Sequence, residues 1–218
     1  MSPSVPLTMF LSMLLYLSQT AFGQDGDKHS RFFSQPILTD SVSTLMIPLT
    51  YSTDLFASNK MLSWGNYYAN IIVYNFTADS YTRLFDEDTF IAAFDLEPHL
   101  PHSNPRGPRL KNFSRDWIFY LVKSSDFNGN GKLDEKDPNV LFVTNRKGEG
   151  LKPLSPPNEN VIAINVYDKQ GFALVKMQRD ANHDKDFKSE DKDSYLVKIN
   201  LSSLQWGNKI EIGSAEMN

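Results

Sequence analysis

The sequence predicts an all-β protein made of antiparallel, repeating strand units, and three observations support this fold class. Short segments rich in Val, Ile, Phe and Tyr alternate with clusters of Asn, Asp, Gly and Pro, which is typical of strands joined by turns. No segment keeps helical periodicity for three full turns, so helix is expected only in the first 23 residues and as a turn in two acidic loops. The later part of the chain also contains an internal repeat of 54 to 55 residues.

The expected strands follow one another from residue 44 to residue 212. They cover Thr44–Tyr51, Asn70–Asn75, Tyr81–Phe85, Phe90–Phe94, Trp117–Lys123, Val140–Asn145, Leu151–Leu154, Val161–Tyr167, Phe172–Gln178, Tyr195–Asn200 and Lys209–Ile212. The segment Pro98–Arg115 carries three prolines between Pro101 and Pro108, and it is expected to form a long surface insertion.

The N-terminus predicts export from the cytoplasm. Met1–Gly23 contains no Asp, Glu, Lys or Arg, has an apolar centre too short to span a bilayer, and ends in the small-x-small run Ala21-Phe22-Gly23. These features predict a cleaved signal peptide over residues 1–23, and no membrane span after cleavage. A polar, flexible leader over residues 24–35 and a single β-rich domain over residues 36–218 then complete the chain.

Composition excludes several classes of function and site. The net charge is −4, so the chain has no basic field to attract nucleic acid. The absence of cysteine excludes disulfides, thiolate catalysis and zinc–thiolate sites. A secreted, periplasmic or extracellular protein without disulfides must be stabilised by its core or by bound metal.

The internal repeat has a recognisable form. Three apolar runs end in Asn75, Asn145 and Asn200, and each is followed by a polar turn and a second apolar segment. The run Val140–Ser155, VLFVTNRKGEGLKPLS, resembles the outer hairpin of a TolB-type or WD40-like propeller blade. This resemblance implies antiparallel, blade-like repeats. Because three units fall short of the four or more blades of a closed propeller, an incomplete propeller and a sandwich both remain open.

The first acidic loop, Asp126–Asp137, reads DFNGNGKLDEKD and places oxygen-bearing side chains at alternate positions. It is similar to the calcium loop of EF-hand and dockerin modules. That resemblance implies side-chain ligands at loop positions 1, 3 and 5, a glycine turn at position 6, a backbone carbonyl ligand at position 7, a ligand through water at position 9 and a closing carboxylate at position 12. The implied ligands are Asp126, Asn128, Asn130, Lys132, Asp134 and Asp137.

The second loop, Asp180–Asp191, reads DANHDKDFKSED and fits the same pattern less closely. Lys185 stands where glycine is expected, at a backbone cost of about 1 kcal/mol. Glu190 and Asp193 are spare carboxylates that can replace the closing one. The implied ligands are Asp180, Asn182, Asp184, Asp186 and Asp191.

Both loops are expected to hold a structural Ca²⁺ between neighbouring strands, with Mg²⁺ and an empty, solvated turn as the alternatives. Neither loop is flanked by the amphipathic helices that a calcium sensor needs, because apolar strand-like runs precede both loops and Pro138 follows Asp137.

The sequence therefore predicts an exported, calcium-binding structural or binding module, and it favours a non-enzymatic role because the common hydrolase and nucleotide motifs are absent. A protein or glycan ligand is left open. The alternatives are a secreted hydrolase of polysaccharide or peptide with structural calcium, and a dockerin-like assembly role.

Overall fold

The computed structural model describes residues 31–39, 43–51, 68–94, 116–188 and 191–211. The expected signal peptide (1–23) and surface insertion (98–115) lie outside these residues. In the described part of the chain, no helix is long and apolar enough to cross a membrane.

The described residues form strands joined by turns, with one short 3₁₀ helix and no α-helix. The elements are β1 (Arg31–Phe33), β2 (Ile37–Leu38), β3 (Thr44–Tyr51), β4 (Tyr68–Asn75), β5 (Ser80–Arg83), β6 (Phe90–Phe94), β7 (Trp117–Lys123), β8 (Val140–Asn145), β9 (Lys152–Pro153), β10 (Asn160–Tyr167), η2 (Asp168–Gln170), β11 (Phe172–Gln178), β12 (Ser194–Asn200) and β13 (Trp206–Glu211).

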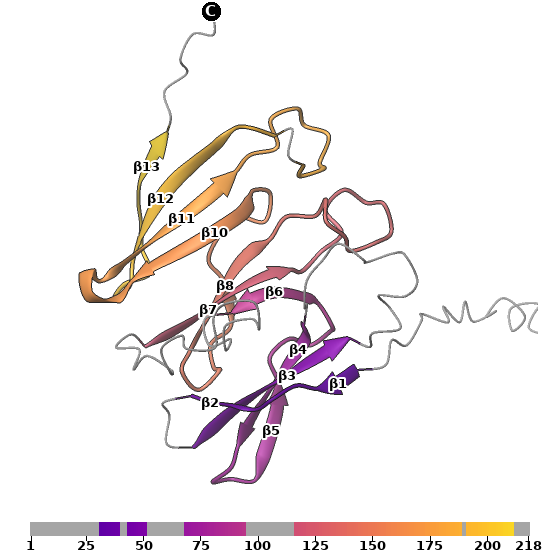
Figure 1. Cartoon of the computed structure of the whole chain (residues 1–218), viewed down its shortest axis with the longest axis vertical. Helices are drawn as coiled ribbons and strands as arrows, with labels where there is room; N and C mark the ends of the chain where they lie inside the picture. The colour runs from indigo at the N-terminus through magenta and orange to yellow at the C-terminus, as the bar shows by residue number, and fades with distance from the viewer. Residues whose placement is uncertain (1–30, 40–42, 52–67, 95–115, 189–190, 212–218) are drawn as a thin grey trace, which may run out of the picture.

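The strands make three antiparallel units; two are meanders of sequential strands, whereas in the unit nearest the N-terminus β1 and β2 both pair with β3 (Figure 1). We call them the first unit (β1–β5), the middle unit (β6–β9) and the last unit (β10–β13). The last unit is a separate four-stranded sheet. The first and middle units share one hydrogen-bonded sheet, but the pairing of Tyr68 with Ile91 is the only register partner between β4 and β6. Within the part of the chain that the structure describes, neither sheet closes on itself.

The middle unit packs against a neighbour on each face. Alternate residues of β7 point to opposite sides, as the pleat requires. Tyr120 lies in a buried cluster with side chains of the first unit, such as Ile71. Phe119 lies in a second buried cluster with side chains of the last unit, such as Val175. The three units are therefore stacked face to face through two apolar cores.

The predicted fold class is confirmed: the structure is all-β, with antiparallel, blade-like repeats that remain open. Five strands have the boundaries that the sequence predicted, namely β3, β6, β7, β8 and β11. In the acidic loops, the expected helical turn is reduced to one hydrogen bond spanning three residues, from Asp137 N–H to the Asp134 carbonyl and from Asp191 N–H to the Lys188 carbonyl.

The predicted leader needs correction at its end. Residues 31–33 form β1, which pairs with Thr50 and its neighbours in β3, so the last part of segment 24–35 belongs to a sheet. Its side chains are exposed, with 76% of Phe33 accessible. A three-residue edge strand without a buried face carries no alternating pattern, so the sequence did not reveal it.

Gly148 shows how closely the units pack, because the turn between β8 and β9 lies against β4. Its φ is +77°, and a Cβ added there would stand 2.7 Å from Cγ2 of Val73. Gly150 has a similar φ of +69°, but open space surrounds it. Both substitutions by alanine therefore carry the left-handed backbone cost, and only one also carries a clash.

We expect Gly148→Ala to lower the free energy of unfolding by about 1–2 kcal/mol more than Gly150→Ala, since overpacking costs about 1–3 kcal/mol and the Val73 methyls can shift. Urea unfolding of the two variants measures this difference directly. Equal losses would show that the turn does not pack against β4 as described.

Candidate metal centre

The two acidic loops occupy equivalent places in the fold. Asp126–Asp137 joins β7 to β8 in the middle unit, and Asp180–Asp191 joins β11 to β12 in the last unit. Both loops extend from the same end of their hairpins (Figure 1). Residues 189 and 190 of the second loop lie outside the described part. The prediction that each loop connects neighbouring strands is thus confirmed by the topology.

In the first loop, the Asp126 carboxylate organises the turn from within. Its Oδ1 accepts hydrogen bonds from the N–H groups of Gly129 at 2.8 Å and Asn130 at 3.1 Å, and its Oδ2 accepts from Gly131 at 2.7 Å. Gly131 has a φ of +80°, which a glycine adopts at little cost. The chain curls around the carboxylate, as the spacing of the loop predicts.

The second loop repeats this curl without its glycines. Asp180 Oδ2 accepts from the Lys185 N–H at 2.9 Å. Lys185 has a φ of +65° and His183 has a φ of +61°, which match Gly131 and Gly129 in the first loop. The expected strain at Lys185 is present, and His183 adds a second strained residue. Two non-glycine residues in the left-handed region need a compensating interaction.

The last carboxylate of each loop fastens the end of the loop to its beginning. Asp137 is fully buried and accepts from the N–H groups of Phe127 at 2.8 Å and Asp134 at 2.7 Å. Asp191 is 6% exposed and accepts from Ala181 at 3.2 Å and Lys188 at 3.1 Å. Both carboxylates therefore make the same two contacts, with tighter geometry in the first loop.

The side chains at positions 3 and 5 fold back over their own loops. Asn128 Oδ1 accepts from the Asn130 N–H at 3.0 Å, and Asn182 Oδ1 accepts from the Asp184 N–H at 3.1 Å. The next pair repeats the pattern, with Asn130 Oδ1 bound by Lys132 N–H and Asp184 Oδ1 bound by Asp186 N–H, both at 2.8 Å. These turns direct the side-chain oxygens at the backbone N–H groups of their own loops.

The carboxylate at position 9 of the first loop and the spare acids near the second loop have different surroundings. Asp134 accepts from the Lys136 N–H at 3.0 Å and from Asn130 Nδ2 at 3.3 Å, so it stays within the first loop. Asp193 pairs with Arg179 at 3.1 Å and is engaged outside the second loop. Glu190 lies outside the described residues.

A test of fit for a cation comes from unsatisfied oxygen atoms. Among the described residues, Asp180 Oδ1 is buried without a hydrogen-bond partner, although Oδ2 of the same carboxylate is bound by the Lys185 N–H. A buried carboxylate oxygen without a partner is costly. It stands at position 1 of the loop, where the resemblance places the first ligand. The donor set thus suits an oxygen-binding cation.

Carboxylates alone do not make this centre. Among the residues that the structure describes, no three His, Cys, Asp or Glu side chains gather into a metal-binding cluster. The physical reason is that the loop carboxylates are directed at backbone N–H groups, as at Asp126 and Asp137. A cation at either loop must also use amide and backbone carbonyl oxygens.

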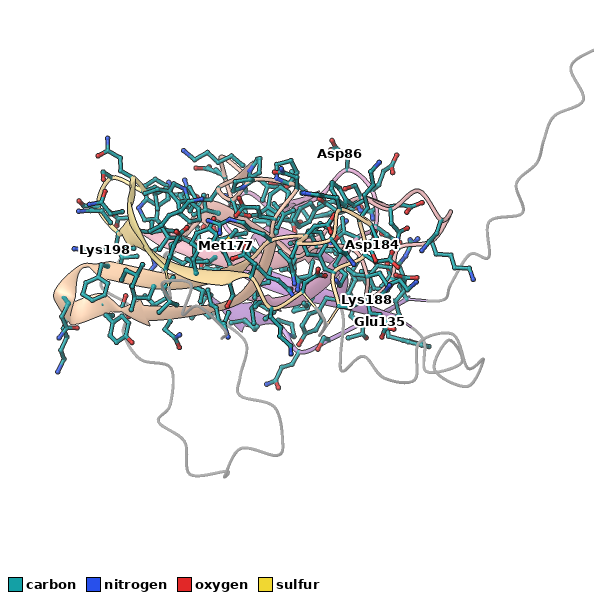
Figure 2. The ribbon with its side chains drawn as sticks, turned by 90° about the horizontal axis from the view of Figure 1, so that it is seen from above. Asp86, Glu135, Met177, Asp184, Lys188 and Lys198 are labelled. Carbon is teal, nitrogen blue, oxygen red and sulfur yellow. The ribbon has the colours of Figure 1, made fainter. Side chains whose placement is uncertain are left out.

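The two loops touch each other, which the sequence did not predict. The Phe187 N–H donates to the Lys136 carbonyl at 2.8 Å, and the Phe127 and Phe187 ring centroids lie 5.8 Å apart. Figure 2 shows Asp184, Lys188 and Glu135 near one another at one end of the molecule, far from Lys198. The loops form one joint acidic surface.

Asp186 is the most connected side chain between the loops. Its Oδ1 accepts from Asn128 Nδ2 at 2.6 Å, and its Oδ2 pairs with Lys188 at 2.8 Å and Lys136 at 2.9 Å. The hydrogen bonds from Lys188 and then Lys136 hold the pKa of Asp186 well below its usual range. This carboxylate is therefore ionised near neutral pH.

A buried lysine makes hydrogen bonds with the backbone of the first loop. Lys123, which ends β7 and is 3% exposed, donates from Nζ to the carbonyls of Glu135, at 3.3 Å, and Asp137. Burial lowers the pKa of its ammonium to about 8, although Asp137 opposes the shift. The sequence signal was available, because this lysine directly follows the continuous apolar run Trp117–Val122.

Comparisons with known proteins do not assign a family. No family model matches the chain, and no curated protein matches it. A solved structure of an oligogalacturonate lyase in complex with manganese resembles 84% of this chain, with a TM-score of 0.41 and 7% sequence identity. The chain spans 43% of the length of that protein. A likeness this distant carries no argument about activity, substrate or metal.

Proposed function

We propose that this protein is an exported, non-enzymatic β module whose two acidic loops each bind one structural Ca²⁺. The observation that carries the proposal is the repetition of one loop geometry 54 residues apart. Three features recur at matching positions of the two loops. They are the hydrogen bonds accepted by the closing carboxylate at position 12, the hydrogen bonds accepted by the side chains at positions 3 and 5, and the residues with left-handed backbone conformation. Solvated turns of different sequence have no physical reason to agree so closely.

The proposed ligands follow from loop position. The first loop offers side-chain oxygens of Asp126, Asn128, Asn130 and Asp137, the carbonyl of Lys132, and Asp134 through water. The second loop offers side-chain oxygens of Asp180, Asn182, Asp184 and Asp191 and the carbonyl of Asp186. Ca²⁺ prefers six to eight such oxygens, and when bound it offsets the repulsion between carboxylates.

The role proposed for the metal is to fix strand ends. Each loop closes a hairpin, β7–β8 or β11–β12, whose strands carry the two apolar cores. The N-terminal sequence supports export, where calcium is abundant enough to fill weak sites. The partner of such a module, a protein or a glycan, is left open.

The test is thermal unfolding of the purified protein in excess EDTA and at about 1 mM Ca²⁺. Sites with Kd of about 10⁻⁴–10⁻³ M add about 0.4–1.4 kcal/mol each at that concentration. Two such sites raise the midpoint by a few degrees, at about 2–4 °C per kcal/mol. We expect the rise to disappear in Asp126→Asn/Asp180→Asn, which keeps the size of both side chains.

The control is Asp86→Asn/Glu87→Gln, which removes two acidic charges from a turn outside the loops and should retain the full rise. The same experiment with Mg²⁺ compares the smaller cation. An unchanged midpoint with either cation would show that both loops are solvated turns, and the proposal would then be abandoned.

A further inference from the structure

Asp186 belongs to the second loop, but its side chain reaches the first. Its Oδ1 accepts a hydrogen bond from Asn128 Nδ2 at 2.6 Å, while its own N–H remains in the second loop, bound to Asp184 at 2.8 Å. The Asp186 side chain is 16% exposed. One residue thus makes hydrogen bonds with both loops.

The contact fixes the orientation of the Asn128 amide. An asparagine side chain carries an NH₂ donor on one side and a carbonyl acceptor on the other. Because Asp186, which can only accept, holds the NH₂ group, Asn128 Oδ1 must face its own loop. There it lies 3.0 Å from the Asn130 N–H, the same N–H group that contacts Asp126.

Two lysines hold the bridging carboxylate in place. Lys136 comes from the first loop and Lys188 from the second, and both contact Asp186 Oδ2. The backbone bond from Phe187 to the Lys136 carbonyl lies next to these contacts and keeps the two chains at a fixed separation. The carboxylate is thus held from both loops.

We propose that Asp186 is a positioning residue that couples the two loops, turning the Asn128 oxygen toward the cation site of the first loop. This inference rests on the proposed function and adds regulation to it. A cation held by the second loop orders Asp186 through its backbone carbonyl, and the first loop then binds its own cation more tightly. Coupling of binding is reciprocal, so the first loop strengthens the second equally.

The decisive experiment isolates the first site and titrates it with Ca²⁺ by calorimetry. Asp180→Asn weakens the second loop, and Asp186→Ala is then added in that background. Loss of a residue that orients a metal ligand typically costs 10–100-fold in affinity. We expect Asp186→Ala to weaken the remaining site by about tenfold, and Asp186→Asn, which keeps an acceptor for Asn128, to weaken it less.

A matched control, Glu135→Gln, tests whether the loss of one negative charge near the site is enough to weaken calcium binding. Glu135 is exposed and lies in the first loop itself, whereas the acceptor for the Asn128 amide is Asp186. Its substitution removes one negative charge near the site and should weaken binding by less than about threefold. Equal losses in Glu135→Gln and Asp186→Ala overturn the positioning role and leave calcium binding intact.

A metal-free measurement gives an independent readout. The NMR signal of the Asn128 side-chain NH₂ is identified by its absence in Asn128→Asp. In EDTA, we expect these NH₂ protons to be protected from exchange with solvent, and to lose this protection in Asp186→Ala. Unprotected protons in the parent protein overturn the inference. No calcium binding by the unmodified protein overturns the inference and the proposed function together, which separates this result from a failure of Asp186 alone.

Discussion

Tyr120→Ala is expected to lower the free energy of unfolding by about 3–5 kcal/mol, the range for truncating a large buried aromatic side chain. Tyr120 is fully buried between the first and middle units, and its ring stacks on Phe94 with centroids 6.1 Å apart. Both units lose packing at once, because the cavity opens in the core that they share. Urea unfolding followed by fluorescence and circular dichroism measures the loss.

The hydroxyl of Tyr120 contributes far less than its ring. It lies 2.9 Å from Thr144 Oγ1, which itself donates to the Asn145 carbonyl at 2.8 Å. Tyr120→Phe therefore leaves Thr144 bonded, and a loss of about 0.5–1.5 kcal/mol is expected. Tyr81→Ala is the surface control, since Tyr81 is 71% exposed. A loss below about 1 kcal/mol in Tyr120→Ala would mean that the units are not packed through this ring.

The second large effect is expected at Asp137 in the absence of any metal. Asp137→Ala removes two hydrogen bonds from a fully buried carboxylate, and bonds to charged groups contribute about 1.5–3 kcal/mol each. It also removes the carboxylate that favours the charged form of buried Lys123. We expect a loss of about 3 kcal/mol or more, measured by chemical unfolding in EDTA.

Asp191→Ala is the matched comparison, because Asp191 has the same place in the second loop. Its hydrogen bonds are longer, at 3.2 and 3.1 Å, so its loss is expected to be about half as large. Asp137→Asn, which keeps one acceptor oxygen, should lie between the parent and Asp137→Ala. Equal losses at Asp137 and Asp191 would contradict the difference in geometry between the loops.

Much of the fold was predictable because the pattern of apolar residues along the buried strands dominates the sequence. Strands such as β7, buried on both faces, read as continuous apolar runs, and their ends were placed correctly. Edge strands gave less signal. β13 begins at Trp206 rather than Lys209, because the glycine and the two polar residues at 207 to 209 are exposed and carry no alternation.

The candidate site was predictable only within each loop. Oxygen-bearing residues at alternate positions predicted that each loop curls. The hydrogen bonds that Asp126 and Asp180 accept from the loop backbone agree with this prediction. The contact between Asn128 and Asp186 joins loops of two different units. Face-to-face packing of those units determines it, and a local pattern contains no information about such packing.

The central position of the middle unit has a consequence for how the protein comes apart. Its two faces are covered, whereas the described residues of the first and last units contribute to one core each. In a linear stack with contacts between neighbours, stability is a sum of unit and interface contributions, so an outer unit opens at the loss of one interface and the middle unit at the loss of two. Opening of the last unit also separates the paired loops, so the acidic surface disassembles before the centre of the stack does.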